Sequence, residues 1–261
     1  MKHWLPILSF HRVCEDDTAP DPLRLCTSTR HLERILQYLR NHQYRFVSPE
    51  KALEVLRSGR PPGARYVCLT FDDGYEDFYL SALPLLREYK APATVFLVTD
   101  CLGATNRWDQ VHNLGAIPLL SLRQVLELDS QGVEFGSHSA SHRRLTSLKS
   151  EELTREVRGS REALEQLLGH EVRFFCYPHG DQSPEVREEV RDAGYAGACG
   201  IEQAAHEPFL LHRIDVSQTS WPATLFRLWG WRYALQHSRT LRAVKGRMLP
   251  ARPTGAMEAG R

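Results

Sequence analysis

The sequence lacks three things: long apolar runs, paired cysteines and net charge. No stretch approaches the ~18 consecutive apolar residues that a membrane-spanning helix needs, so we expect no such helix. The formal net charge of the 261 residues is +1, which argues against a nucleic-acid partner. The six cysteines contain no CxxC pair, and in a chain that is neither short nor visibly secreted we expect no disulfide framework.

A secretion signal and internal repeats are also not apparent. The apolar run within residues 1–13 is too short for a signal peptide and contains a proline, so we expect a cytoplasmic location. No internal repeat or low-complexity segment stands out, and the length fits one large domain or two small ones.

The positive charge that the chain does carry is concentrated near its C-terminus. Residues 217–261 contain eight lysines and arginines and one acid, Glu258, and residues 221–247 combine six basic residues with three tryptophans. This segment is either a helix packed on the body with a solvated basic face, or a peripheral contact with the inner membrane surface. We expect a catalytic domain over 1–216 and a basic helical tail over 217–261, disordered in its last part.

Apolar strands alternate with segments of helical periodicity throughout residues 5–216. The pattern predicts about seven parallel strands joined by crossover helices, in an open α/β sheet or a barrel. Active residues of such folds lie at the carboxyl ends of the strands. The polar residues at predicted strand ends are therefore the candidate site: His11, Asp72, Asp73, His138, His142 and residues 177–181.

Two adjacent carboxylates, Asp72 and Asp73, end the apolar run 66–71. Side by side they would repel each other unless a cation lies beside them. One could then ligate the cation, and the other could act as general base on a water molecule whose pKa the cation lowers. Gly74 permits a sharp turn after the pair. The alternative, a turn that closes a hairpin, is disfavoured by the helical pattern that follows.

His138 and His142 are spaced i, i+4, so on one helical turn they would face the same way and could hold one cation. They could equally be unrelated histidines in a chain that contains twelve. A carboxylate from another strand end would complete a site of two histidines and one aspartate with open positions for water. That is the layout of a catalytic metal site.

Three motifs, TFDDG (70–74), HSASH (138–142) and YPHGD (177–181), resemble in order and spacing those of the polysaccharide deacetylases of NodB-homology type, carbohydrate esterase family 4. The resemblance covers residues 4–216 and implies a distorted (β/α) barrel. It assigns Asp73, His138 and His142 as ligands of a divalent metal, Zn²⁺ ahead of Co²⁺ or Ni²⁺. It assigns Asp72 as the base.

The third motif departs from the family pattern Arg-x-Pro-Tyr-Gly. Cys176 stands at the arginine position and His179 at the tyrosine position. A backbone N–H survives a change of side chain, so that of His179 can still hold an oxyanion. The arginine that would orient the base is missing, as in the subgroup that acts on exopolysaccharide N-acetylglucosamine. The resemblance also makes Tyr177, Pro178 and Gly180 expected substrate contacts.

Deacetylation needs a general acid for the leaving amine, and two histidines compete for this role. The same subgroup begins with a strand that ends in YHRV-like residues, and SFHRV places His11 there. The rival is His212, in a sequence that loosely echoes a late Leu-x-x-His motif of the family.

The remaining candidate substrate contacts are Trp108, Arg213 and His212. The indole of Trp108 could stack on a sugar ring, or Trp108 and Asp109 could simply anchor a loop. Arg213 and Asp215 follow His212 on the last predicted strand, where they line the pocket or only pair with each other.

The sequence thus predicts a metal-dependent hydrolase of non-peptide C–N bonds. It would remove the N-acetyl group from an N-acetylhexosamine unit of a glycan or glycan precursor, as in exopolysaccharide or cell-surface biosynthesis. One alternative is a deformylase or deacetylase of a lipid-linked or nucleotide-linked sugar, or of another small amide. An alternative of another class is a barrel that binds glycan without catalysis, and the intact Asp72 argues against it.

Overall fold

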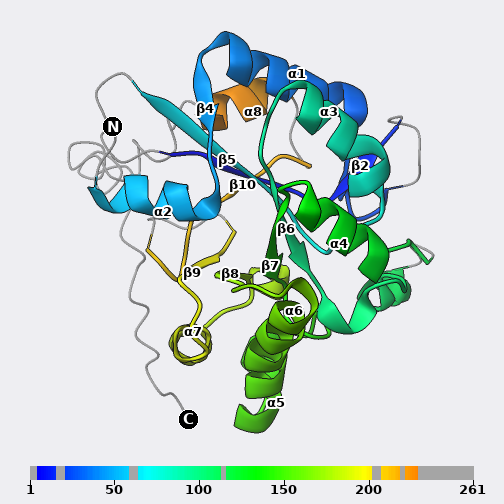
Figure 1. Ribbon diagram of the computed structural model, residues 1–261, viewed down its shortest axis with the longest axis vertical. Coiled ribbons are helices and arrows are strands. Elements are labelled where there is room, and N and C mark those ends of the chain that lie inside the picture. The colour runs from blue at the N-terminus through cyan, green and yellow to red at the C-terminus, as the bar shows by residue number, and fades with distance from the viewer. Residues whose placement is uncertain are drawn as a thin grey trace, which may run out of the picture.

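The computed structural model describes residues 5–15, 21–58, 64–112, 116–201, 207–217 and 221–228. A parallel sheet of eight strands runs through the middle of the molecule, with helices around its outside (Figure 1). The strand order is β10-β1-β5-β6-β7-β8-β9, with β4 also paired to β5. The strands are β1 (Ile7–Phe10), β4 (Tyr44–Phe46), β5 (Arg65–Phe71), β6 (Thr94–Leu97), β7 (Glu134–Ser137), β8 (Phe174–Cys176), β9 (Gly197–Cys199) and β10 (Ile214–Asp215).

The helices follow the strands as the alternating pattern predicts. Serine caps begin three of them, at Ser28, Ser121 and Ser183, where each hydroxyl accepts a hydrogen bond from a first-turn N–H. A π-helical stretch, Arg155–Gly159, joins α5 (Ser150–Thr154) to α6 (Ser160–Leu168). Helix α6 ends at Gly169, whose φ is 75°. The helices are α1 (Thr29–Asn41), α2 (Pro49–Ser58), α3 (Leu83–Glu88), α4 (Leu122–Ser130), α5 (Ser150–Thr154), α6 (Ser160–Leu168), α7 (Pro184–Asp192) and α8 (Trp221–Leu228).

The sheet curls, so that it buries one apolar cluster inside the curl and another under the helices. Cys68, Phe96 and Cys176 belong to the inner cluster, whereas Val67 and Leu69, on the other face of β5, belong to the outer one. Strand β5 is therefore buried on both faces, which explains its unbroken apolar run. A parallel bridge between Cys199 and Leu211 brings the chain back along β9 before it enters β10. The fold is the distorted barrel that the sequence predicts.

A small second sheet of β2 (Arg12–Cys14) and β3 (Cys26–Ser28) corrects one expectation. Strand β1 ends just before His11, as the sequence predicts, and residues 12–14 then pair with β3. This pairing places the Cα atoms of Cys14 and Cys26 5.9 Å apart, and the two cysteines form a disulfide. The expectation of no disulfide is therefore wrong. The partner strand comes from a separate segment, which the spacing of cysteines does not reveal.

Helix α8 is the described part of the predicted basic tail. The ring of Trp221 meets that of Tyr38, on α1, edge to face, with ring centres 5.7 Å apart. Thr224 and Leu228 are buried. Residues 221–228 thus follow the interpretation of a helix packed on the body. Residues 218–220 and 229–261 of the predicted tail lie outside the described residues, and the division at residue 216 stays a prediction. Among the described helices, none is long and apolar enough to span a bilayer.

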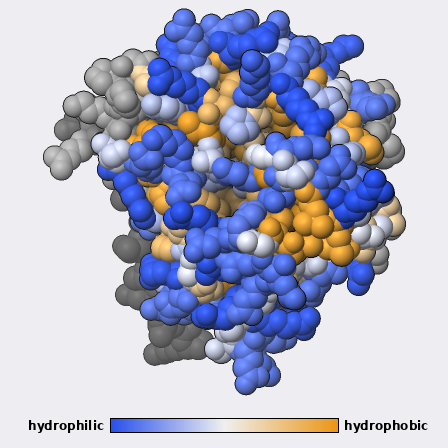
Figure 2. All heavy atoms as spheres, in the orientation of Figure 1, coloured by the Kyte–Doolittle hydropathy of each residue, from blue (hydrophilic) through white to orange (hydrophobic). Residues whose placement is uncertain are grey.

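The face seen in Figure 2 is mostly hydrophilic and has several apolar areas, the widest in the part of the view where Figure 1 places α4. Helix α4 carries two exposed leucines, Leu122 and Leu126, one turn apart. Single exposed leucines are ordinary on protein surfaces, so this area by itself indicates no function.

Candidate active site

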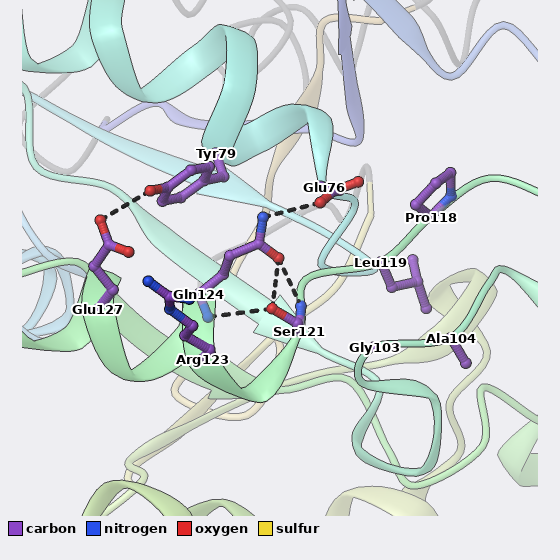
Figure 3. Close-up of a pocket in the computed structure, with 10 residues that line it drawn as sticks. All are labelled: Glu76, Tyr79, Gly103, Ala104, Pro118, Leu119, Ser121, Arg123, Gln124 and Glu127. Carbon is purple, nitrogen blue, oxygen red and sulfur yellow. Dashed lines mark hydrogen bonds between the residues drawn. The ribbon is translucent and has the colours of Figure 1, made fainter.

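Two of the cavities in the described part of the molecule bear on where the site lies, and both are lined by polar side chains. The larger, of about 460 Å³, lies beside α4 and is lined by Glu76, Tyr79, Gln124 and Glu127 among others (Figure 3). The smaller, of about 210 Å³, lies at the carboxyl ends of the strands. It collects most of the residues that the sequence singles out: His11, Asp72, Asp73, Trp108, His138, His142, Tyr177 and His179.

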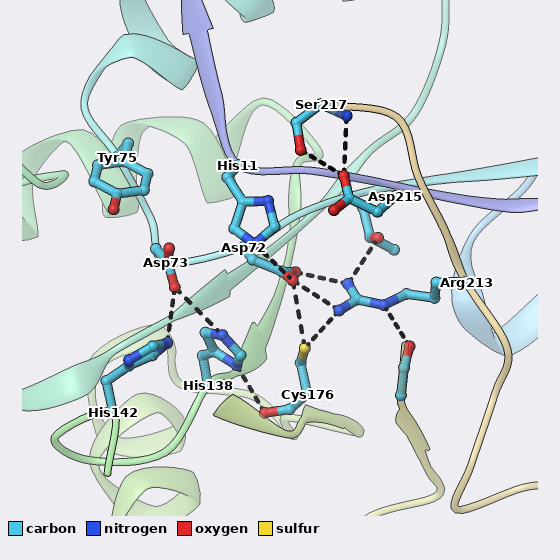
Figure 4. Close-up of polar contacts among 12 residues, drawn as sticks. His11, Asp72, Asp73, Tyr75, His138, His142, Cys176, Arg213, Asp215 and Ser217 are labelled. Carbon is cyan, nitrogen blue, oxygen red and sulfur yellow. Dashed lines mark hydrogen bonds and ion pairs between the residues drawn. The ribbon is translucent and has the colours of Figure 1, made fainter. Parts of the chain in front are cut away.

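At the end of β5 the backbone turns, so that the side chains of Asp72 and Asp73 point apart. The N–H of Asp72 still donates to the carbonyl of Phe10, at 2.8 Å. Asp73 and Gly74 then both take left-handed conformations, with φ 69° and 71°. A Cβ at Gly74 would lie 2.6 Å from Leu97 Cδ2, so the tight turn requires glycine. The turn sends Asp72 and Asp73 in different directions (Figure 4).

His138 and His142 meet, but not on a helical turn. They belong to a loop after β7 in which Ser139 and His142 have φ 67° and 62°. Ser139 Oγ accepts from the N–H of His142 at 3.0 Å, and buried Glu156 accepts from the N–H of Ser141 at 2.8 Å. The expected i, i+4 helical geometry is therefore wrong. The loop conformation, held by these hydrogen bonds, aims both rings at one point.

Three ligand atoms converge on that point. Asp73 Oδ1 lies 3.3 Å from His138 Nε2 and 3.1 Å from His142 Nε2, and all three side chains are buried. Even so, Asp73 Oδ1 makes no well-formed hydrogen bond. His138 Nδ1 lies 2.7 Å from the carbonyl of Cys176, which can only accept, so Nδ1 donates and Nε2 presents its lone pair. Burial lowers the pKa of His142 to about 4, which keeps that ring neutral near neutral pH.

This donor set fits a divalent metal. Two imidazoles and one carboxylate, with room beside them, are the ligands of a catalytic zinc-type site, and a bound metal would take both rings in their neutral form. A second cluster, Asp72, His138 and Cys176, is also close enough to be considered. There, however, the guanidinium of Arg213 already occupies both Asp72 and Cys176, and its charge opposes a cation. The candidate metal site is therefore formed by Asp73, His138 and His142.

Arg213 supplies the base-orienting arginine that the third motif lacks. Its Nη1 and Nη2 donate to Asp72 Oδ1 and Oδ2, each at 2.7 Å, and its Nε donates to the carbonyl of Gly200 at 3.1 Å. Burial alone would raise the pKa of Asp72, but the charge and hydrogen bonds of Arg213 outweigh it and lower the pKa below its usual value. Asp72 is thus held as a carboxylate at the cavity.

This arrangement corrects two predictions about Arg213. The side chain is fully buried, so it cannot contact substrate, and its partner is Asp72 rather than Asp215. Arg213 lies just before β10, and the small Cys176 leaves space for its side chain, with Sγ 3.0 Å from Nη2. Arg213 thus takes the place of the arginine that the third motif lacks. No local sequence signal links Arg213 to Cys176, because the two residues lie 37 positions apart in the chain.

Of the two candidate general acids, only His11 lines the cavity. Its Nε2 lies 3.8 Å from Asp72 Oδ2, and its side chain is 14% exposed. Asp215, with Leu23, Leu25 and Ile201, also lines the cavity, and the three apolar residues have no signature in the sequence. His212 lies outside this lining. The role of His11 as acid stays a prediction, and its position favours it.

Of the other predicted substrate contacts, some line the cavity and others do not. Trp108 stacks on His142 with ring centres 4.4 Å apart and planes at 30°, and His179 meets the same imidazole edge-on at 4.5 Å. Tyr177 lines the cavity while its hydroxyl donates to the carbonyl of Phe209 at 2.9 Å. Pro178 and Gly180 shape the turn that carries His179, with φ 57° at His179, but do not line the cavity.

Comparison with known proteins gives a consistent result. A family model described as polysaccharide deacetylase matches residues 59–198. The poly-beta-1,6-N-acetyl-D-glucosamine N-deacetylase of Staphylococcus epidermidis is 26% identical over 245 residues, covering 85% of this chain and 82% of that protein.

Solved structures agree in fold. The deacetylase PplD of Streptococcus pyogenes, in complex with acetate, aligns with a TM-score of 0.71 at 26% identity, covering 86% of this chain and 97% of that one. IcaB from Ammonifex degensii aligns with a TM-score of 0.69 at 25% identity, covering 86% and 96%.

Proposed function

This chain belongs to the polysaccharide deacetylase family, and from that premise we propose that it removes N-acetyl groups from N-acetylhexosamine units of an exopolysaccharide. The name of the staphylococcal relative supports this substrate class. One observation carries the proposal for this chain. A metal-type donor set, a carboxylate held ionised and a histidine opposite it share one cavity.

The chain's own groups divide the reaction among them. Asp73, His138 and His142 would hold the metal, which when bound polarises the amide carbonyl and lowers the pKa of water. Asp72 accepts the proton of the attacking water, since its ion pair with Arg213 keeps it a carboxylate. His11, on the other side of Asp72, gives a proton to the departing amine.

The family depends on a divalent metal, and we place Zn²⁺ ahead of Co²⁺ and Ni²⁺. Two imidazoles and a carboxylate suit all three ions, and zinc accepts a small coordination number with open positions. The backbone N–H of His179, next to His142, is the proposed donor to the oxyanion.

The test is release of acetate and formate from N-acylated sugars, as oligomers, monomers and lipid-linked or nucleotide-linked forms, by protein loaded with each metal. Asp72→Asn should keep the metal and lose about 10²- to 10⁴-fold in kcat, because the base is removed while the ligands stay. Full activity in that variant would overturn the mechanism. No acyl release from any substrate by the wild-type protein would favour the glycan-binding alternative.

Where the enzyme works remains a proposal. The predicted cytoplasmic location, with contact at the inner membrane surface, would suit a lipid-linked substrate. The Cys14–Cys26 disulfide argues the other way, since such bonds persist in oxidising compartments. Cell fractionation combined with thiol labelling of these two cysteines distinguishes the locations. Labelling of both in freshly lysed cells would support the cytoplasm.

A further inference from the structure

Asp109 lies in the wall of the active cavity and has no part in the reaction described above. It sits in a short helical turn, Arg107–His112, directly after Trp108, and its side chain is 7% exposed. A carboxylate so deeply buried needs a reason, because burial of a charged group is unfavourable unless partners offset it.

Only one of its two oxygens is occupied. Oδ2 accepts from the hydroxyl of Tyr75 at 3.2 Å and, at the long distance of 3.5 Å, from the amide of Asn106. Asn106 is itself oriented by the N–H of Ile117, which donates to its Oδ1 at 2.8 Å and turns its NH₂ toward Asp109. Among the described residues no hydrogen bond involves Oδ1 of Asp109, and Asp109 lines the cavity.

An anchor for the loop would not require this charge. Asparagine would accept the same hydrogen bonds from Tyr75 and Asn106 through its carbonyl. The carboxylate is instead disfavoured here, since burial and then the charge of Asp73 raise the pKa of Asp109. What a carboxylate adds is a second strong acceptor, on a residue that lines the cavity.

The neighbours of Asp109 indicate which donor it meets. Trp108 presents an indole ring over His142, at the metal site, and indole faces stack on sugar rings. Asp109 also lines the same cavity as Asp73 and His142, which places it near the reacting centre and not near a remote unit of the glycan. The donors that a hexosamine ring offers beside its acyl amide are hydroxyl groups.

We propose that Asp109 is a specificity-determining residue, whose Oδ1 accepts a hydrogen bond from a ring hydroxyl of the same hexosamine whose N-acyl group is cleaved. Tyr75, two residues after Asp73, positions it by holding the other oxygen. The inference rests on the proposed function, since it assigns a contact to that substrate. It explains why a tyrosine of the metal-ligand loop reaches across to a carboxylate in another loop.

The test compares Asp109→Asn with the wild type on an N-acetylhexosamine and its monodeoxy analogues. The variant should raise KM about 10-fold on the full substrate, with kcat and bound metal unchanged, because a charged hydrogen bond to the sugar is lost. On one analogue, the one that lacks the contacted hydroxyl, wild type and variant should show the same KM. Tyr75→Phe should raise KM in the same analogue-dependent way, by less.

Glu127→Gln is the matched control, because Glu127 also accepts from a tyrosine, Tyr79, but outside this cavity. It should leave KM unchanged. Unchanged KM in Asp109→Asn, an equal loss on every analogue, or loss of metal would overturn the proposal. If Asp109→Asn does not fold, the analogue series with Tyr75→Phe decides.

Failure of the proposed function gives a different result. In that case the wild-type protein releases no acyl group from any hexosamine. Calorimetric binding of the sugars to wild type and Asp109→Asn then decides on Asp109. Equal affinities would overturn its role, and weaker binding by the variant would support it.

Discussion

The two polar cavities differ more in how their groups are paired than in size. In the larger cavity the side chains satisfy one another: Tyr79 donates to Glu127 at 2.8 Å, and Gln124 donates to Glu76 at 2.9 Å (Figure 3). In the smaller cavity, buried polar atoms have no hydrogen-bond partner, among them His11 Nδ1, Asp73 Oδ1 and His142 Nδ1.

This difference identifies the functional cavity better than volume does. Leaving a buried donor or acceptor unpaired costs about 1–3 kcal/mol, so folding alone would not favour three such atoms in one place. A bound metal would complete the coordination of Asp73 Oδ1, the one of these atoms at the convergence point. The larger cavity has no comparable set of unpaired groups, and a ligand there would first have to displace existing hydrogen bonds.

Of the substitutions that test this comparison, the removal of a metal ligand should have the largest effect. Asp73→Ala deletes the only carboxylate at the convergence point, so we expect loss of bound metal and of deacetylation together. Elemental analysis after dialysis and acetate release measure both. Asp100→Ala, which removes an exposed carboxylate paired with Arg155, is the control and should change neither. Full metal content in Asp73→Ala would contradict the assignment.

Arg213→Met tests the buried pair that holds the base. An unpaired carboxylate would remain at Asp72, which should lower the free energy of unfolding by about 3–5 kcal/mol. The pKa of Asp72 should rise, because burial then acts without its cation, and the acid limb of the kcat profile should move to higher pH. Urea unfolding and pH–rate profiles measure these effects.

The sign of the pH dependence follows from the direction of the Asp72 pKa shift. The wild-type pKa is lowered, so the pair stabilises the fold above the unfolded-state pKa of about 3.9. This stabilisation is lost as the pH falls through the native pKa, and the variant should then approach the wild type. Arg173→Met, which breaks an exposed pair with Glu50, is the control and should show almost no loss. A similarly small loss in Arg213→Met would contradict the role.

The disulfide between Cys14 and Cys26 closes a loop beside the small cavity. Leu23 and Leu25, which line the cavity, belong to this loop. Replacing both cysteines with serine should lower the free energy of unfolding by about 2–4 kcal/mol and raise KM. Thermal unfolding with and without reductant measures this. A reductant that leaves the wild-type transition unchanged would show that the bond is absent.

The smallest effect is expected in the larger cavity. Tyr79→Phe removes the donor to Glu127, in a network that nothing connects to the reaction. Activity, KM and metal content should equal those of the wild type. A marked rise in KM for long glycans, with none for short ones, would instead make this cavity a binding site for a distant sugar unit.

Much of the fold could be predicted because the pattern is local. Serine caps, the helix after Ser28 and the run 65–71 each depend on neighbouring residues, and the alternation of strands and helices admits few topologies. Strand β4 and the β2–β3 pair, each of three-residue strands, were not predicted. The helical turn expected for His138 and His142 failed because equal spacing also fits a loop with left-handed residues.

The sequence by itself determined the chemistry at the strand ends. Parallel strands place their carboxyl ends together, so Asp72, Asp73, His138 and His142 had to meet near one edge. Only the tertiary structure decided which group each one meets. The partner of Asp72 is Arg213, 141 positions away and just before β10, and in the sheet only β1 lies between β10 and β5. Such a pairing depends on strand order and on the space that Cys176 leaves, and neither is a property of local sequence.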